Sequence, residues 1–331
     1  TEHNMEEERK NRSVWIIIVA VLVVVGICCC LAAAMAAGGL LFVAPVATER
    51  SDMSWDAGGG KRSWQHYEVG KSPVLKIDNF SGSISVRATE ETGIEIVAHK
   101  QARRKSDLDK IEVDISRTSN GLSIRTKKPA GVGSAWVQFE ILAPAGTQLD
   151  ARTGSGSMRI DGIHGGVKSH SASGSLVIID AQGGVNAHTG SGSIEVRGAG
   201  RGTRVDSGSG SLRIDNVRDE LQAETGSGSI RVRDASGPVQ LESGSGGLDY
   251  AGSPQGESRF QTGSGGITLL LPSDLDMNLD LHTGSGQIDV SHEMTGPVTA
   301  SKGEVRGQVG SGEDGTIWAR TGSGNIRLES P

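Results

Sequence analysis

The sequence is poor in aromatic residues: five Trp, two Tyr and four Phe occur among 331 residues. Aromatic side chains normally supply much of the buried area of a globular core, so their scarcity argues against a conventional layered domain. A core must then be stacked from Ile, Val and Leu, which a regularly repeating chain achieves. The 49 glycines suit such a chain, because each repeat needs tight corners.

The sequence also lacks a surplus of basic charge. Its 33 Lys and Arg stand against 39 Asp and Glu, a formal net charge of -6, and both signs are spread along the chain. A nucleic-acid-binding surface needs a basic stripe that neutralises phosphates. Nucleic acid is therefore excluded as an expected partner.

Cysteine is nearly absent. The three cysteines are consecutive, Cys28 to Cys30, and lie inside an apolar run, so no disulfide framework is expected. We interpret them as small apolar packing residues rather than as metal ligands. Ile27 stands where a lipoprotein acceptor site has a small residue, which excludes that anchor.

Catalytic motifs are missing as well. The sequence has no G-x-S-x-G elbow and no H-E-x-x-H pair. GSGEDG at Gly310–Gly315 fits the dinucleotide fingerprint, but residues of β type follow it rather than a helix, so we interpret it as a chance match. After residue 150 only Tyr250, Phe260 and Trp318 are aromatic, too few for sugar platforms. We predict no enzyme activity, no catalytic residue and no cofactor.

A long apolar run lies near the N-terminus. No charged residue occurs from Ser13 to Thr48, which exceeds the roughly 20 residues that cross a bilayer. We therefore predict a transmembrane helix within residues 13–48. A cleaved signal peptide is the alternative, with Ala34-Met35-Ala36 as its small-residue site.

Basic residues flank the N-terminal side of this run. Arg9, Lys10 and Arg12 precede it, so the positive-inside rule assigns residues 1–12 to the cytoplasm as a short tail. The expected location is the cell membrane, single-pass, with the C-terminal region extracytoplasmic. Membrane lipid, contacted through residues 13–48, is the first expected partner.

A turn motif of the form TGSGS recurs through the C-terminal half. Its first residue stands at a fixed spacing of 18 over six repeats and continues less regularly to a degenerate copy and a last one: Thr153, Ser171, Thr189, Ser207, Thr225, Ser243, then Thr262, Thr283, Ser301 and Thr321. Self-similarity at a fixed period is typical of a solenoid, in which each unit packs on its neighbours.

Alternating strands separate the turns. Ile194 to Arg197 follows one turn and Val239 to Glu242 leads into another, each with apolar residues at every second position. We predict an all-β fold over residues 151–331: a β-solenoid of the parallel β-helix or β-roll type with 18-residue coils of two strands. The stacked Ser and Thr hydroxyls are expected to form hydrogen bonds along the axis.

In-register coils place residues 18 apart about 4.8 Å from each other. Glu195 then lies beside Arg213, and Arg197, Asp215 and Arg233 alternate in sign along the next row, which favours the register. Calcium-binding β-rolls also have 18-residue coils, but Ile194 stands where their repeat carries Asp. We expect no metal site of that kind.

The chain before residue 151 is less regular. We predict an irregular β cap region over residues 66–150, which includes an early degenerate turn at Phe80–Ile84. Residues 49–65, with the triplet Gly58-Gly59-Gly60, are predicted as a linker.

One outward row stands out as a candidate binding site. Its six members are 18 residues apart and each precedes a turn: Arg152, His170, His188, Asp206, Glu224 and Glu242. The three acidic members form a like-charge column that attracts cations or a basic partner. We predict weak dependence on pH or divalent cations; identical melting curves with and without calcium between about pH 5 and pH 8 would contradict it. A plain solvated face is the alternative.

Two segments join strand, proline turn and TGSGS motif in the same way: FEILAPAGTQLDARTGSGSMRI from Phe139 and ITLLLPSDLDMNLDLHTGSGQIDV from Ile267. Between about Val74 and Leu328 the chain resembles a bacterial family of β-strand-repeat domains of unknown function, named putative adhesins. The resemblance implies the fold, a preceding membrane segment in many members, an envelope-stress context in some, and no catalytic residues.

Three functions are compatible with these features. The leading one is a non-enzymatic, adhesin-like surface module that binds a cell-envelope polymer, a partner protein or copies of itself by multivalent display on a rigid rod. The second is a membrane-tethered sensor or regulator of envelope stress, which needs a membrane partner because its cytoplasmic tail is short. The third is an enzyme acting on polysaccharide.

Overall fold

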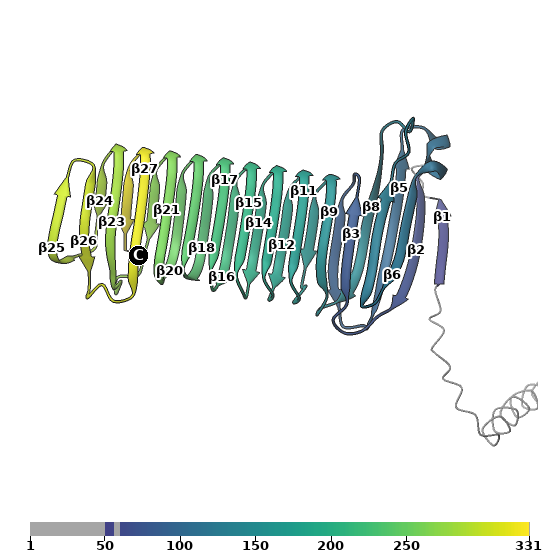
Figure 1. Cartoon of the computed structure of the whole chain (residues 1–331), viewed down its shortest axis with the longest axis horizontal. Helices are drawn as coiled ribbons and strands as arrows, with labels where there is room; N and C mark the ends of the chain where they lie inside the picture. The colour runs from purple at the N-terminus through teal and green to yellow at the C-terminus, as the bar shows by residue number, and fades with distance from the viewer. Residues whose placement is uncertain (1–49, 56–59, 331) are drawn as a thin grey trace, which may run out of the picture. The chain divides into compact units, whose positions relative to one another are not determined.

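A computed structural model describes residues 50–55 and 60–330, which belong to one compact unit, Thr48–Pro331. The described residues of this unit are all-β apart from one short 3-10 helix, η1 (Lys105–Lys110), and their strands form two stacked sheets (Figure 1). The transmembrane helix predicted within residues 13–48, the tail 1–12 and the alternative signal peptide lie outside the described residues. Among the residues that are described, no helix has the length and apolar character to span a membrane.

Each sheet has 14 strands. Sheet A consists of β1 (Arg50–Trp55), β2 (Lys61–Glu68), β5 (Gly93–Ala102), β8 (Ala135–Pro144), β4 (Ile84–Thr89), β10 (Met158–Asp161), β12 (Leu176–Ala181), β14 (Ile194–Ala199), β16 (Leu212–Arg218), β18 (Ile230–Gly237), β20 (Leu248–Pro254), β22 (Ile267–Leu270), β28 (Ile326–Glu329) and β24 (Ile288–Val290), in that spatial order.

Sheet B runs alongside it. Its spatial order is β25 (Met294–Ser301), β26 (Glu304–Val309), β23 (Met277–Ser285), β27 (Gly315–Ser323), β21 (Gly256–Ser264), β19 (Val239–Ser245), β17 (Leu221–Ser227), β15 (Thr203–Ser209), β13 (Val185–Ser191), β11 (Val167–Ser173), β9 (Gln148–Ser155), β3 (Val74–Asn79), β7 (Gly121–Lys127) and β6 (Glu112–Thr118).

The predicted 18-residue coil of two strands is confirmed in the middle of the unit. Each coil passes along a strand of sheet B, turns at TGSGS and returns along a strand of sheet A, and equivalent strands pair in parallel. Val167 pairs with Val185 and Val185 with Thr203, each 18 residues on. The long parallel sheets are those of a solenoid.

The second glycine of each TGSGS turn is required by its surroundings. Gly192 has φ +150°, and a Cβ there would lie 2.3 Å from the carbonyl oxygen of Gly174 in the coil before it. The buried hydroxyl of Thr189 donates a hydrogen bond of 2.9 Å to that same oxygen. The motif therefore fixes both the corner and its attachment to the neighbouring coil. Hydroxyls do form hydrogen bonds along the axis, mainly to backbone oxygens, although Ser285 also donates to the Ser323 hydroxyl at 3.4 Å.

The corner that follows each strand of sheet A also has a feature that recurs every 18 residues, which was not predicted from the sequence. Five successive coils carry a residue with left-handed φ at the equivalent position: Gly162, Asp180, Gly198, Asn216 and Asp234. Only Gly, Asn and Asp adopt this conformation readily. The corner therefore tolerates three residue types, and no single motif reveals it.

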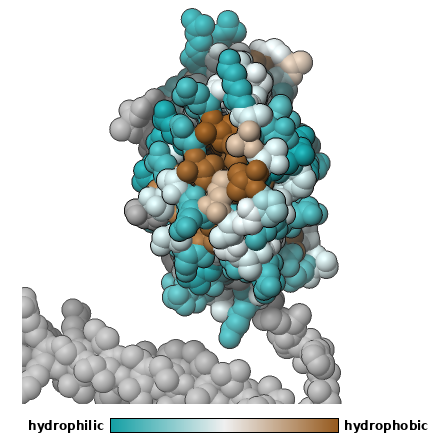
Figure 2. Space-filling model, turned by 90° about the vertical axis from the view of Figure 1, so that its left-hand side faces the viewer, coloured by the Kyte–Doolittle hydropathy of each residue, from teal (hydrophilic) through white to brown (hydrophobic). Residues whose placement is uncertain are grey.

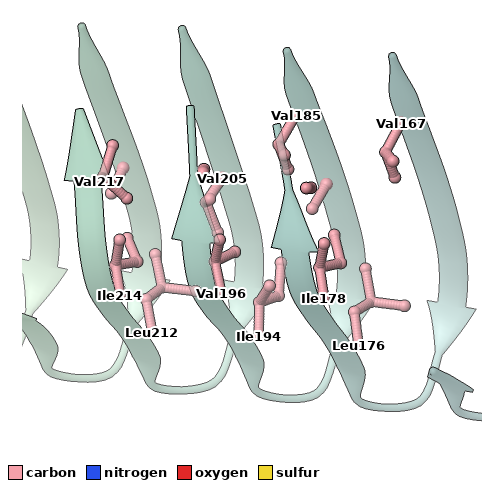
Figure 3. Packing of buried hydrophobic residues seen from close by; sticks show 14 of the residues in the cluster. Val167, Leu176, Ile178, Val185, Ile194, Val196, Val205, Leu212, Ile214 and Val217 are labelled. Atoms are coloured by element: carbon pink, nitrogen blue, oxygen red, sulfur yellow. The ribbon is translucent and has the colours of Figure 1, made fainter. Parts of the chain in front are cut away.

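The core lies between the two sheets. Val185 and Val205 from sheet B point toward Ile194 and Val196 from sheet A, and the same arrangement repeats from coil to coil (Figure 3). These four side chains are fully or almost fully buried. The largest aromatic contact in the stack is Tyr250 against Phe260, with ring centroids 5.2 Å apart. Aliphatic stacking thus replaces the missing aromatic core, as predicted.

Ser169 interrupts this apolar interior. Its hydroxyl is buried and has no hydrogen-bond partner among the described residues, while Ala151 and Ala187 take the equivalent positions in the adjacent coils. We expect Ser169→Ala to raise the free energy of unfolding by about 1 kcal/mol, since an unsatisfied buried hydroxyl is removed. The matched variant Ser171→Ala removes a hydroxyl that donates to the Gly156 carbonyl at 3.1 Å, and urea melts should show it destabilised by a similar amount. Loss of stability in both variants would contradict this prediction.

The C-terminal coils do not stack in chain order. The last coil, β27–β28, pairs with β21–β22 on one side and with β23–β24 on the other, so it lies between two coils that precede it in the sequence. The degenerate turn predicted at Ser301 is wrong as a stacked corner. It ends β25, which pairs antiparallel with β26 in a hairpin beyond the stack, because Lys302 and Gly303 form the hairpin turn.

At the N-terminal end, too, a coil lies between two coils that are not both its neighbours in the sequence. The first coil, β3–β4, lies between β9–β10 and β7–β8, although β7–β8 follows it in the chain. Within the predicted cap region 66–150, this coil and the early turn at Gly82 therefore belong to the stack itself. The antiparallel strands β2, β5 and β6 lie beyond it.

Residues 49–65 were predicted as a linker, and this needs correction. Strand β1 and the first half of β2 fall in that range and pair antiparallel, and β2 continues onto β5 with Trp64 opposite Val97. Residues from Lys61 onward instead form a strand of sheet A that lies between β5 and the edge strand β1.

The outer face of sheet A carries the predicted charge pattern. Glu195 pairs with Arg213 in the strand register, and its Oε1 lies 3.7 Å from Arg213 Nε. Arg197, Asp215 and Arg233 follow one another along the adjacent row. A slip by one residue would bury these charges, so they specify register more than they stabilise it.

The GSGEDG loop has a structural role. It connects β26 to β27 without a helix and wraps the carboxylate of Asp276, which accepts hydrogen bonds from the Ser311 hydroxyl at 2.8 Å and from the amides of Gly312 and Glu313. The hydroxyl hydrogen bond, followed by the backbone amides, lowers the pKa of Asp276 below its ordinary value. The glycine-rich loop thus binds an anion that the chain itself supplies.

We expect the hydrogen bonds that hold the loop on the Asp276 carboxylate to weaken in acid. A depressed pKa means that Asp276 stabilises the fold above about pH 4 and that this contribution is lost as the pH falls through the lower pKa of the folded state. The variant Asp276→Asn should melt at a lower temperature at neutral pH and show a flatter acid limb, whereas Asp274→Asn, at an exposed neighbour, should match the wild type in thermal melts. Equal melting curves for the two variants would count against this role of Asp276.

Candidate functional site

The six candidate residues form one continuous row on the outer face of sheet B. Arg152, His170, His188, Asp206, Glu224 and Glu242 come from β9, β11, β13, β15, β17 and β19, and each pairs with the next in the parallel register. The row therefore spans six adjacent strands at the strand spacing of about 4.8 Å.

The basic half of the row is internally connected. The rings of His170 and His188 stack with centroids 4.8 Å apart and planes 7° from parallel. His188 Nδ1 lies 3.3 Å from Asp206 Oδ2, and Arg152 donates to both carboxylate oxygens of Asp150 at 3.2 and 3.3 Å. Arg152 and His188 thereby each have an acidic partner within the chain.

The acidic half is open. Glu224 and Glu242 form no ion pair or side-chain hydrogen bond with any described residue, and together with Asp206 they line a small hollow of about 60 Å³. No group of three His, Cys, Asp or Glu side chains in residues 60–330 is arranged to hold a metal ion. The row is thus polarised, basic toward β9 and acidic toward β19.

The histidine pair makes this face sensitive to acid. Burial lowers the pKa of His170 below its ordinary value, and His188 and Arg152 lower it further by repulsion. A depressed histidine pKa means that stability is fully present above about pH 6.5 and decreases as the pH falls below it. We expect the melting temperature of the full chain to fall modestly from pH 7 to about pH 5 and less so in His170→Gln. An equal fall in both proteins would assign the effect to other groups.

A groove runs beside the row, toward the start of the sheet B strands. It has a volume of about 650 Å³ and extends across β3, β9, β11, β13 and β15. A second hollow of about 280 Å³ at Arg152, His170 and His188 shares residues with it. The groove volume lies within the range of ligand sites, and it is elongated along the stacking direction.

Cations alternate with other residues along this groove. The register places five residues in a line on adjacent strands: Lys76, Asp150, Lys168, Asn186 and Arg204. Lys76 and Lys168 are exposed and form no ion pair or side-chain hydrogen bond within the described chain. Arg204 donates to the neutral side chain of Gln222 at 2.8 Å. Because Asp150 is paired with Arg152, the line keeps three uncompensated positive charges.

Glycines open the wall of the groove. Gly166, Gly184 and Gly202 occupy equivalent positions just before β11, β13 and β15, while Glu220 and Pro238 take this position in the next two coils. None of the three glycines has a left-handed φ, and an added Cβ would meet at most one backbone oxygen at 3.5 Å. Their backbone does not require glycine, so what the small residues provide is open space.

Sequence reasoning found the row but not the groove. Lys168 and Arg204 are 36 residues apart, a multiple of the repeat, whereas Lys76 precedes the regular repeats and its place in the line depends on the displaced first coil. The glycine triplet at Gly166, Gly184 and Gly202 was detectable as an 18-residue series. This series does not stand out in the sequence, because every coil contains several other glycines.

A family model described as Toastrack DUF4097 matches residues 74–329. The chain belongs to the Toastrack family. The matched range runs from the first residue of β3 to the last residue of β28, so the Toastrack unit contains the stack of coils, while β1 and β2 at the N-terminal end of sheet A lie outside it. The predicted resemblance to a β-strand-repeat family of unknown function is confirmed.

The Toastrack unit is similar to three solved structures. They are a putative adhesin from Bacteroides fragilis (12% identity, 81% of this chain and 96% of that chain, TM-score 0.43), a putative cell adhesion protein from Clostridium sporogenes (9%, 86% and 100%, TM-score 0.19) and a putative adhesin from Parabacteroides merdae (12%, 63% and 92%, TM-score 0.25). These overlaps are too loose to establish a common architecture. No curated protein matches the chain.

The Toastrack unit also exposes apolar surface at one end. Viewed from the end that carries β25 and β26, hydrophobic side chains gather at the centre of a hydrophilic rim (Figure 2). The partly buried apolar residues of the strands at this end are Ile288, Val290, Met294 and Val305, and Val298 is 46% exposed. The core is therefore less completely covered here than in the middle of the stack.

Proposed function

We propose that the chain is a non-enzymatic, membrane-anchored and extracytoplasmic module that binds an extended partner along the outer face of sheet B. Residues 13–48 supply the anchor in this proposal, and the cell-envelope side is where the module acts. The observation that carries it is the groove, which crosses five strands and lies beside the row from Arg152 to Glu242. An extended ligand fits such a site better than a compact one.

The arrangement of titratable groups supports binding rather than catalysis. Catalytic acids and bases are usually buried or closely paired so that their pKa values match the reaction. The side chains of the groove instead stand on an open sheet, and Lys76, Lys168 and Arg204 are exposed. Repeated contacts along a rigid rod add up to useful affinity even when each contact is weak.

The proposal is tested by binding and turnover with the same ligands. We expect the full chain, purified in detergent and immobilised, to bind envelope-type polymers from a panel of acidic, neutral and basic chains. Affinity should rise steeply with polymer length, and no new chain ends should form. Absence of binding to every polymer, or release of fragments, would overturn the proposal. If the immobilised chain instead recovers a membrane regulatory protein, the alternative function as a membrane-tethered sensor of envelope stress is favoured.

A second candidate function, self-association, is favoured by the order of charges in the row. A two-fold axis along the strand direction between β13 and β15 brings Arg152 opposite Glu242 of a second copy, His170 opposite Glu224 and His188 opposite Asp206. The row is therefore complementary to itself when reversed, as an isologous dimer requires. On the side of the row toward the TGSGS turns the outward positions are small, with Gly190 and Ala172 among them, so a second face can approach closely there.

Charge inversion tests the second candidate. One variant carries Arg152→Glu with His170→Glu, and the other carries Glu224→Lys with Glu242→Lys. We expect each alone to sediment as a monomer and an equal mixture to form dimers, because only the mixed pair restores attraction. Wild-type protein that stays monomeric at low salt and high concentration would exclude this function.

A further inference from the structure

We propose that the groove of sheet B binds a linear acidic polysaccharide with one carboxylate per disaccharide, laid along the stacking direction across β3, β9, β11, β13 and β15. This inference rests on the function proposed above and adds the class of ligand and its contacts. Lys76, Lys168 and Arg204 bind the carboxylates, and Gly166, Gly184 and Gly202 make room for the sugar rings.

Charge selects an anionic ligand. The groove contains one carboxylate, Asp150, and both of its oxygens accept hydrogen bonds from Arg152. The neighbouring Asp206 carboxylate lies against His188. These two carboxylates are thus directed to partners within the chain, while Lys76 and Lys168 project without one. The open carboxylates of Glu224 and Glu242 belong to β17 and β19, beyond the last strand of the groove. A neutral or basic polymer leaves these ammonium groups uncompensated.

The distance between the groove cations indicates how far apart the carboxylates of the ligand are. Lys76, Lys168 and Arg204 are each separated by two strand steps, which is roughly 9–10 Å at the usual strand spacing. This distance is close to the length of one disaccharide in an extended glycan chain. A polymer with a carboxylate on every second sugar therefore meets a cation at each carboxylate, and Asn186 lies opposite an intervening sugar, whose hydroxyls can both donate to and accept from its amide.

Shape selects a chain of sugars rather than a slender polyanion. The groove crosses five strands, a length of roughly 19 Å, and its volume of about 650 Å³ accommodates several pyranose rings. It ends where Glu220 and Pro238 replace the glycines of the wall. The glycine opening therefore accompanies Lys168, Asn186 and Arg204, while Gln148 and Val74 take the equivalent positions in the coils of Asp150 and Lys76.

The experiment measures binding of defined oligosaccharides to the full chain in detergent. The acidic probe is a hyaluronan octasaccharide, which has one carboxylate per disaccharide; a chito-oligosaccharide of the same length is the neutral probe, and polyphosphate tests charge alone. We expect binding of the acidic probe that weakens with salt, at least ~10-fold weaker binding of the neutral one, and weaker binding of polyphosphate than of hyaluronan.

Two kinds of variant locate the site. Lys168→Gln combined with Arg204→Gln removes charge, and we expect a loss of affinity of about 10-fold or more, while Lys128→Gln, at an exposed lysine outside the groove, changes affinity less than about twofold. Gly184→Val and Gly202→Val place a side chain in the groove at positions where an added Cβ meets no atom closer than 3.5 Å, and they should also weaken binding. Gly133→Val, at an open glycine in another loop, is the control.

The outcomes separate the inference from the function on which it rests. Hyaluronan affinity that is unchanged in both groove variants while melting curves match the wild type would overturn the inference, and so would equal binding of the neutral probe or tighter binding of polyphosphate. The proposed function survives these results, since a polymer is still bound. If no polymer in the panel binds, the proposed function and the inference both fall.

Discussion

The variant Gly192→Ala is expected to lose at least ~3 kcal/mol of folding free energy, or to fail to fold, although it adds a single methyl group. The residue has φ +150°, a conformation that L side chains rarely adopt, at a cost of about 1–3 kcal/mol. The added Cβ would also lie 2.3 Å from the Gly174 carbonyl oxygen and 2.7 Å from its carbon. That contact can be relieved only by moving two coils apart.

Moving the coils apart breaks further interactions at the same corner. The Gly174 oxygen accepts the hydrogen bond from Thr189, and the amide of Gly174 donates to Ser191 at 2.9 Å. The substitution at Gly192 is therefore expected to disturb the backbone contacts between two coils and not only its own side chain. Chemical unfolding followed by circular dichroism measures the change, with hydrogen exchange reporting whether the two adjacent coils lose protection first.

The matched control is the first glycine of the same turn. Gly190→Ala adds the same methyl group two residues earlier, where the backbone has no left-handed φ and the coil before it already carries alanine, Ala172. The added Cβ would still lie 2.6 Å from the Ala172 carbonyl oxygen, so we expect a measurable loss of folding free energy that is clearly smaller than in Gly192→Ala. Equal losses at Gly190 and Gly192 would mean that glycine acts in these turns through general flexibility, and the corner geometry given above would be wrong.

Deletion of residues 315–331 is expected to unfold more than the coil it removes. Strands β27 and β28 bury Ile317, Ile326 and Leu328 completely or nearly so, which together contribute roughly 5–9 kcal/mol of apolar burial as an upper value. Because this coil lies between β21–β22 and β23–β24, its loss removes two interfaces rather than one. We expect β23 to β26 to lose their ordered packing on the rest of the stack.

Hydrogen exchange distinguishes the possible results. We expect amides of β23 and β26 to exchange as in an unfolded chain, while those of β11 to β17 remain protected, since coils contact only their neighbours. Removal of Ser330 and Pro331 alone is the control; it removes only an exposed hydrogen bond from the Ser330 amide to the Ser291 hydroxyl and should leave the protection of β23 and β26 unchanged. Full protection of β23 in the larger deletion would show that its own TGSGS turn, at Thr283, restacks directly on β21–β22 in chain order.

The regular part of the fold was predictable because the period is explicit. An 18-residue spacing, a turn glycine and alternation of apolar residues determine the coil, the two strands and the register, and the pairing of Glu195 with Arg213 follows from these alone. The two ends were not predictable. Which coil lies beside β21 depends on competition between two similar TGSGS coils, beginning at Thr283 and Thr321, and local sequence does not rank them.

The candidate site also has a part that the sequence predicts and a part that it does not. The row from Arg152 to Glu242 was predictable because all its members come from regular coils. The line of groove cations was not, because Lys76 reaches it through the first coil, which is placed next to β9 by a long-range connection. Local sequence also does not reveal that Asp150 turns toward Arg152 rather than toward Lys168.

Placing the first and last coils one layer inside the stack also has a mechanical consequence. In a simple solenoid, a pull on a terminus peels the outermost coil from a single neighbour, and the rod can unravel one coil at a time. Here a pull on the C-terminus loads β28 and β27, each of which is paired on both edges. Both ladders must break together, so force-induced unfolding should begin with a high-force event at the end instead of a gradual lengthening.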